Sequence, residues 1–155
     1  MSDETTSGDE PRPPARLQQL ASWQANKVSI LGARMTARHM PLTARGEFAV
    51  LAALEEYGAL SQADLGRLLG LDRNEVSGIV TRLEQGAGVD RQPDPADRRR
   101  NVVTLTAAGQ RRLAEMQRQA DQAQDELLAG LDAGERDQLN ALLAKVLARH
   151  RPQPA

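Results

Sequence analysis

Two helix-capping patterns lie close together in the middle of this chain and leave few ways to fold the segment that they bracket. Ser61 stands three residues before Asp64, and Asp72 stands three residues before Glu75, which is the spacing of a capping box. Gly70 lies between the two patterns, where a left-handed residue can end the first helix. The pattern therefore predicts two helices joined by a turn of about three residues, which is short enough to hold them at a steep angle.

The second of these helices has one apolar face and one polar face. Its apolar residues follow the i, i+3, i+4, i+7 spacing of a helix packed on a core: Val76, Ile79, Val80 and Leu83. The opposite face carries side chains that can bind base edges and phosphates: Arg73, Asn74, Ser77, Thr81 and Arg82. Gly78 lies on this face, although a glycine inside a helix costs about 0.8–1 kcal/mol relative to alanine. Close approach to a DNA groove would explain the glycine, and an ordinary solvated face is the alternative.

An arginine-rich connection follows the second helix. Two short runs, 89–92 and 101–105, have strand-like content, and the prolines at 93 and 95 exclude a continuous helix between them. The connection carries one acidic residue and three arginines: Asp97, Arg98, Arg99 and Arg100. Asp97 could pair with one arginine and fix its direction. A solvated charge run is the usual interpretation of such a segment, but beside a helix-turn-helix it predicts a hairpin that contacts DNA.

The charge of the chain is distributed unevenly along its length. The net charge over 155 residues is −1, so any attraction for a polyanion must be local. Residues 91–112 contain six arginines and two aspartates, whereas the first ten residues contain four carboxylates and no basic residue. This asymmetry indicates a basic binding face around the predicted hairpin.

Helices with apolar faces are expected on both sides of this centre. Residues 15–38 and a segment beginning near Thr43 precede it, and 106–128 and a segment beginning at Asp132 follow it. The outer helices carry more apolar surface than one small lobe can cover, which predicts a homodimer interface. An intramolecular bundle alone is the alternative. The polar, proline-bearing residues 1–14 are expected to form a disordered tail.

Several functional classes are disfavoured by the composition. The chain has no cysteine and therefore no disulfide or thiolate metal site, and no apolar run approaches membrane-spanning length. Its two histidines, His39 and His150, lie far apart in the sequence, and no phosphate loop, metal-ligand cluster or Ser/His/Asp set is evident. The chain is therefore expected to be a cytoplasmic protein that is not an enzyme, with no cofactor or metal and no membrane partner.

One group of residues on the first helix could bind a small molecule: Trp23, Arg34 and His39. A lone tryptophan with a nearby arginine would suit a small aromatic or phenolic effector that carries a carboxylate. The alternative is that Trp23 belongs to a dimer core and that Arg34 is an ordinary surface charge.

Taken together, the motifs resemble those of the MarR family of bacterial winged-helix regulators. Asp97-x-Arg99, followed by Leu105-Thr106, is similar to the wing of that family, and residues 60–65 and 76–84 are similar to its helix-turn-helix. The resemblance covers residues 42–109. It implies a mainly α fold, a single domain over 15–155, in which 42–109 form a winged helix-turn-helix DNA-binding lobe and two flanking segments form a dimerisation lobe: 15–41 and 110–150.

The resemblance also implies a function. Members of the family bind palindromic double-stranded DNA, an inverted repeat, as homodimers, usually as repressors that a small ligand releases. By position, Arg99 would enter the minor groove with Asp97 as its orienting partner, and the polar face of the second helix would lie at the major groove. A winged helix that serves only as a protein-interaction module is the alternative. One departure, Gly86-Ala87-Gly88 in place of the family's single glycine, leads us to expect a looser junction with the wing.

Overall fold

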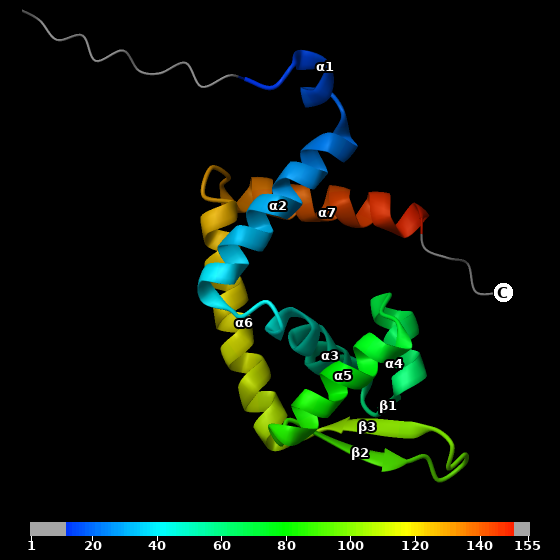
Figure 1. Cartoon of the computed structure of the whole chain (residues 1–155). Coiled ribbons are helices and arrows are strands. Elements are labelled where there is room, and N and C mark those ends of the chain that lie inside the picture. Colours follow the sequence, from blue (N-terminus) through cyan, green and yellow to red (C-terminus); the bar gives the residue numbers. More distant parts are fainter. Residues whose placement is uncertain (1–11, 151–155) are drawn as a thin grey trace, which may run out of the picture.

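The structure is a computed structural model that describes residues 12–150, a mainly helical chain with one small sheet (Figure 1). Its elements occur in this order: α1 (Ala15–Gln18), α2 (Ala21–His39), α3 (Ala44–Tyr57), β1 (Leu60–Ser61), α4 (Gln62–Leu69), α5 (Arg73–Gln85), β2 (Val89–Pro93), β3 (Asn101–Leu105), α6 (Ala107–Leu127) and α7 (Ala133–Arg149). Most of the predicted tail, residues 1–11, lies outside the described residues, and 12–14 form no helix or strand.

The elements form two parts that α6 connects (Figure 1). Helices α3, α4 and α5 and the sheet form one part, and α6 starts directly after β3 at its base. From there α6 runs side by side with α2 to the other end of the molecule, where α7 crosses (Figure 1). No helix within residues 12–150 combines the length and the apolarity needed to cross a membrane.

The core lies among α3, α4, α5, the sheet and the first half of α6. Its fully buried side chains come from all of these except α6: Val50, Leu51, Leu65, Val76, Val80, Leu83, Val89 and Val103. Leu113 and Met116 of α6 are also buried in this cluster. Each side chain of this size contributes about 1.5–3 kcal/mol when it leaves water. The apolar face predicted for α5 is confirmed, since Ile79 is buried with the other three residues.

The sheet has the strand order β1-β3-β2 within the described residues. Strands β2 and β3 form the predicted antiparallel hairpin, with Val89 opposite Leu105 and Pro93 opposite Asn101. The two-residue strand β1 pairs with the other edge of β3 and attaches the hairpin to the start of α4. We did not predict β1, because two residues are too few to show a strand periodicity.

The outer helices differ from the prediction in two places. The single helix expected over 15–38 is interrupted, because Leu20 has an extended backbone (ψ 110°) and α2 begins only at Ala21. Neither α1 nor α2 contains a buried residue, so packing within this chain does not hold the two segments in line. Thr43 precedes α3 as expected, but its side chain makes no capping hydrogen bond; its backbone is already helical.

Candidate nucleic-acid interface

The helix-turn-helix is fixed by its caps. Ser61 Oγ accepts a hydrogen bond from the Asp64 backbone N–H (3.1 Å), and Gly70 ends α4 in the left-handed region (φ 67°). Asp72 and Glu75 form a complete capping box, in which each side chain accepts the other's backbone N–H at 2.8 Å. Both predicted caps and the turn between α4 and α5 are therefore confirmed, and they aim the polar face of α5 away from the core.

That polar face is open to solvent for most of its length. Arg73 and Asn74 are exposed, Ser77 and Thr81 are partly exposed, and Arg73 makes no hydrogen bond or ion pair with a described residue. Arg82 is different. Its Nε lies 3.3 Å from Oε1 of Glu47, a carboxylate of α3 that is 4% exposed. The structure thus brings four of the five predicted residues to a free surface, while Arg82 is engaged by the protein itself.

Packing within the chain does not require a glycine at position 78. A Cβ at Gly78 would meet only Arg82 Nη1 at 3.6 Å, which is ordinary van der Waals contact. By contrast, a Cβ at Gly109 would lie 2.0 Å from the carbonyl oxygen of Gly88, so no side chain fits there. Alanine would be the better helix former at 78, so the intramolecular contacts give no reason for a glycine there.

The tip of the wing presents Arg99 to solvent. Asp97 Oδ1 accepts hydrogen bonds from the backbone N–H of Arg99 (3.1 Å) and from its Nε (3.3 Å), while the Arg99 side chain remains 92% exposed. Asp97 therefore orients Arg99, as the sequence suggested. Arg98 is also exposed, and it makes no hydrogen bond or ion pair within residues 12–150.

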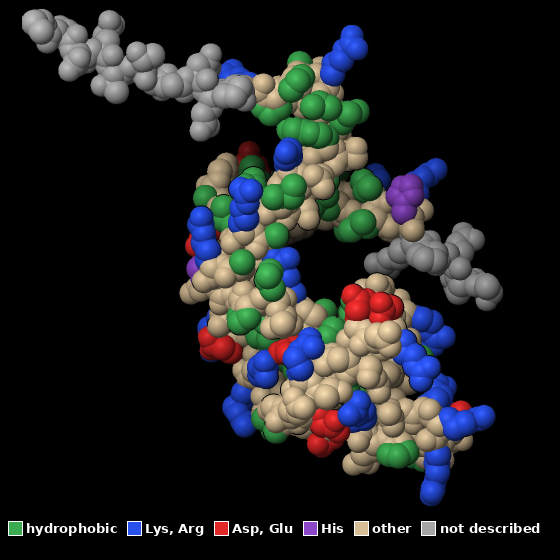
Figure 2. Space-filling view, in the orientation of Figure 1, with side chains coloured by type: hydrophobic (Ala, Val, Ile, Leu, Met, Phe, Trp, Pro, Cys, Tyr) green, Lys and Arg blue, Asp and Glu red, His purple; other side chains and the backbone are tan. Residues whose placement is uncertain are grey.

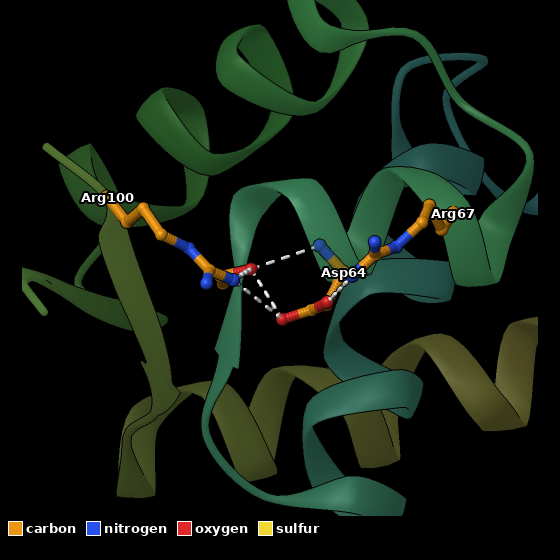
Figure 3. A network of polar contacts seen from close by, with 4 residues as sticks. Asp64, Arg67 and Arg100 are labelled. Atoms are coloured by element: carbon orange, nitrogen blue, oxygen red, sulfur yellow. Dashed lines mark hydrogen bonds and ion pairs between the residues drawn. The ribbon is translucent and has the colours of Figure 1, made fainter. Parts of the chain in front are cut away.

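Arg100 points back toward α4 (Figure 3). Its Nη2 lies 3.0 Å from Ser61 Oγ and 3.4 Å from Asp64 Oδ2, and Arg67 pairs with the other oxygen of Asp64. The hydrogen bond from Ser61, together with Arg67, lowers the pKa of the Asp64 carboxyl below its ordinary value. Sequence analysis placed Arg100 among the arginines that contact DNA; in the structure its side chain instead attaches the wing to the start of α4.

A groove of about 710 Å³ lies between α4, the start of α5 and the wing. Among the described residues, five arginines and no acidic side chain line it: Arg67, Arg73, Arg91, Arg99 and Arg100. Figure 2 shows Lys and Arg side chains gathered on the side of the molecule that carries α4 and the wing. Sequence analysis did not name Arg67 or Arg91 as site residues. Arg67 lies on α4 and pairs with Asp64 one turn before it, whereas Arg91 lines the groove only once β2 has folded against α5, where it pairs with Glu84 at 2.6 Å.

The junction between α5 and the wing is firmly bonded, so the looseness expected there is wrong. The backbone N–H of Ala87 donates to Glu84 O (2.9 Å), and that of Gly88 donates to Leu83 O (2.8 Å). Thr106, the residue between β3 and α6, closes the junction, because its Oγ1 donates to Ala87 O (2.6 Å) and its N–H donates to Gly88 O (3.2 Å). Ala87 itself adopts a positive φ of 54°.

The three residues considered for a ligand do not converge on one site. Trp23 and His39 lie about 24 Å apart along α2, at 1.5 Å per residue. His39 Nε2 lies 2.7 Å from Glu126 Oε1 on α6, and Lys27 Nζ lies over the Trp23 ring at 5.2 Å from its centre. None of the three, Arg34 included, lines the hollow of about 350 Å³ between α2, α3 and α6, whose rim carries Arg45.

The capped helix pair with its basic wing is matched by known proteins. A family model described as the MarR family matches residues 40–100. The structure of BpsR from Bordetella bronchiseptica, solved to explain how 6-hydroxynicotinic acid regulates its DNA binding, is 30% identical with a TM-score of 0.73. The alignment covers 86% of this chain and 97% of BpsR. This chain belongs to the MarR family.

Other transcriptional regulators are similar over much of the chain. The HTH-type transcriptional repressor NicR of Pseudomonas putida is 38% identical over 101 residues, 65% of this chain. The match spans 64% of the length of NicR. The PcaV regulator of Streptomyces coelicolor, solved with its natural ligand, is 25% identical with a TM-score of 0.74, and the alignment covers 88% of this chain and 98% of PcaV. The expected mainly α winged-helix fold is therefore confirmed for this MarR-family chain.

Proposed function

We propose that this MarR-family chain is a homodimeric regulator of transcription that binds an inverted repeat in duplex DNA. The observation that carries the proposal is the groove lined by five arginines and, within the described residues, by no acidic side chain. It lies between a recognition helix with an open polar face and a wing whose Arg99 side chain is 92% exposed. The repressor NicR, a relative, supports repression as the mode of action.

We expect α5 and the wing to contact different parts of the DNA. Asn74, Ser77 and Thr81 would face base edges in the major groove, where amide and hydroxyl groups can distinguish base pairs. Arg99, steered by Asp97, would enter the minor groove, while Arg73 would contact phosphate. Arg98 would add phosphate contact, because it is exposed beside Arg99.

The proposal of a homodimer rests on apolar surface that the outer helices leave exposed. Neither α2 nor α7, both entirely within residues 12–150, contains a buried residue. Large apolar side chains stay exposed on α1, α2 and α7 and in the link between α1 and α2: Leu17, Leu20, Val28, Ile30, Leu31, Leu142, Leu143, Val146 and Leu147. Helices of this kind owe most of their stability to packing of an apolar face, and a second copy would provide it. A two-fold dimer would place its recognition helices about one DNA turn apart.

A small aromatic or phenolic carboxylate is the effector class that we propose as the releasing ligand. BpsR supports it, since 6-hydroxynicotinic acid regulates DNA binding by that relative. We place the effector in the hollow between α2, α3 and α6, where Phe48 offers a ring and Arg45 a cation, rather than at Trp23, Arg34 and His39. The hollow adjoins both parts of the molecule, so a ligand there could alter their relative position. We place the protein's action in the cytoplasm, where bacterial DNA lies.

The proposal can be tested by selection from random duplex DNA with the purified full chain. We expect enrichment of an inverted repeat, bound with an affinity that falls steeply as salt rises. The binding should weaken when 6-hydroxynicotinate, used as the effector probe, is added. If the chain instead serves only as a protein-interaction module, low-salt titration with random duplex will give no salt-sensitive binding, and the proposal of DNA regulation fails.

A further inference from the structure

We propose that Glu47 is a positioning residue that joins the recognition helix to α6 through Arg82 and Arg112 and thereby sets the half-site spacing that the dimer accepts. The inference rests on the proposed DNA-binding function. It assigns Arg82, expected from the sequence to read bases, a role inside the protein. The Glu47 node, meaning Glu47, Arg82 and Arg112, connects three helices: α3, α5 and α6.

Both oxygens of the Glu47 carboxylate are used. Arg82 Nε donates to Oε1 at 3.3 Å, and Arg112 Nη2 donates to Oε2. Glu47 is the only charged residue that is buried among those described, whereas the two guanidinium groups remain about half exposed. A buried carboxylate is costly unless charge and hydrogen bonds compensate it, so this one holds both arginines to it.

The node lies where α6 leaves the DNA-binding part. Helix α3 packs against both α5 and α6, and Glu47 faces the two arginines from α3. Apolar packing already holds α6, because Gly109 packs directly against the carbonyl of Gly88 and Leu113 and Met116 are buried in the core. Apolar contacts are non-directional, so they leave room for a small change in the tilt of the helix. The hydrogen bond from Arg112 to Glu47 adds a directional attachment that restricts this tilt.

The direction of α6 determines how far apart two recognition helices stand. Helix α6 has 21 residues and spans about 30 Å, from the wing to the end where α7 crosses (Figure 1). A tilt of about 6° at one end of such a helix displaces the other end by about 3 Å. That displacement is close to the 3.4 Å or so between successive base pairs. Weakening the node should therefore relax the spacing requirement between half-sites without changing the bases that are preferred.

The test uses the full-length protein and the selected inverted repeat, with the half-sites at their selected separation or with one base pair inserted or removed. For Arg112→Gln we expect the ratio of affinities for the selected over the altered spacing to fall about three- to tenfold. Arg111→Gln is the matched control, since the adjacent Arg111 is exposed and makes no hydrogen bond or ion pair with a described residue. Arg111→Gln removes the same charge and should weaken binding to DNA of every half-site spacing by the same factor.

A second variant separates the two roles of Arg82. Arg82→Lys keeps the charge but loses the Nε donor, so it should relax the spacing preference and leave the base preference at every position intact. Circular dichroism first checks that the Arg112→Gln variant is folded. The inference is wrong if this folded variant keeps the wild-type ratio of affinities for the selected over the altered spacing. It is also wrong if Arg82→Lys changes base preference at one position instead. If the wild-type protein shows no sequence preference at all, the proposed function itself has failed.

Discussion

Arg100 of the wing donates a hydrogen bond to Ser61, the residue that caps α4, across 3.0 Å. The preceding residue, Arg99, points into solvent from the same turn. Two adjacent arginines therefore serve different purposes: one attaches the wing to the helix-turn-helix, and the other remains available for DNA.

Replacing Arg99 by alanine should weaken DNA binding without affecting the fold. The side chain is 92% exposed, so the free energy of unfolding should change by no more than about 0.5 kcal/mol. Affinity should fall for many sequences alike, and the slope of log affinity against log salt should decrease in size by about one. Fluorescence anisotropy over a salt series measures both quantities. An unchanged slope would show that Arg99 does not reach the DNA backbone.

Arg100→Ala should loosen the wing instead. The ion pair with Asp64 is partly exposed, so its loss should cost no more than about 1 kcal/mol of stability. The amide protons of residues 94–100 should exchange faster with solvent, because the tip loses its attachment to α4. Hydrogen exchange measured by NMR checks this, with Arg98→Ala as the control that removes an exposed arginine from the same turn. Equal protection in both variants would contradict the attachment.

The lowered pKa of Asp64 predicts acid sensitivity. Its folded-state pKa lies below the ordinary Asp value of 3.8, so the stabilisation is present above that value and is lost as pH falls through the folded pKa. The difference in unfolding free energy between wild type and Asp64→Asn should therefore shrink between about pH 5 and pH 3. Urea denaturation across this range measures it. A difference that stays constant would show that the Asp64 contacts do not depend on its charge.

Gly78→Ala should raise the stability of the protein and lower its affinity for DNA. The new methyl group would be in ordinary contact with Arg82, and helix propensity should raise the free energy of unfolding by about 0.8–1 kcal/mol. DNA affinity should fall, because the methyl group stands on the face proposed to enter the major groove. Chemical denaturation and a DNA titration of one preparation give both values. A variant that is more stable and binds equally well would identify Gly78 as a tolerated glycine.

Val146→Asp should produce a monomer. Val146 is 61% exposed within one chain, so the charge is tolerated there but would be buried against a second copy. Analytical ultracentrifugation measures the change in mass. Ala141→Asp, which places the same charge on the opposite side of α7, is the control and should remain dimeric. If both variants keep the mass of the wild type, α7 is not part of the interface.

Features that depend on neighbouring residues could be predicted from the sequence. The caps at Ser61, Asp72, Thr106 and Asp132 are confirmed because each involves groups three residues apart. The pairing of Arg82 with Glu47 could not be predicted, since it joins residues 35 positions apart that meet only once α3 and α5 have packed. A polar helix face looks the same in a sequence whether its arginine faces DNA or a buried carboxylate.

The strand β1 and the break before α2 escaped prediction for related reasons. Strand β1 exists because β3 offers a free edge, which is a property of the folded hairpin. The break at Leu20 lies in a segment without buried residues, where local patterning has no packing to reinforce it. Patterns among neighbouring residues therefore predicted the helix-turn-helix and the wing. Which arginines form no ion pair within the protein depends on tertiary contacts, which these patterns do not show.

Helices α2 and α7 contain no fully buried residue within their own chain, so in the proposed dimer they would couple regulation to protein abundance. If these helices are completed only by a second copy, folding of that part is coupled to association, and its midpoint temperature should rise with protein concentration. Occupancy of a promoter would then respond to roughly the square of the protein concentration while monomers predominate. A cell could thus switch the regulated genes by changing its synthesis of this chain a few-fold.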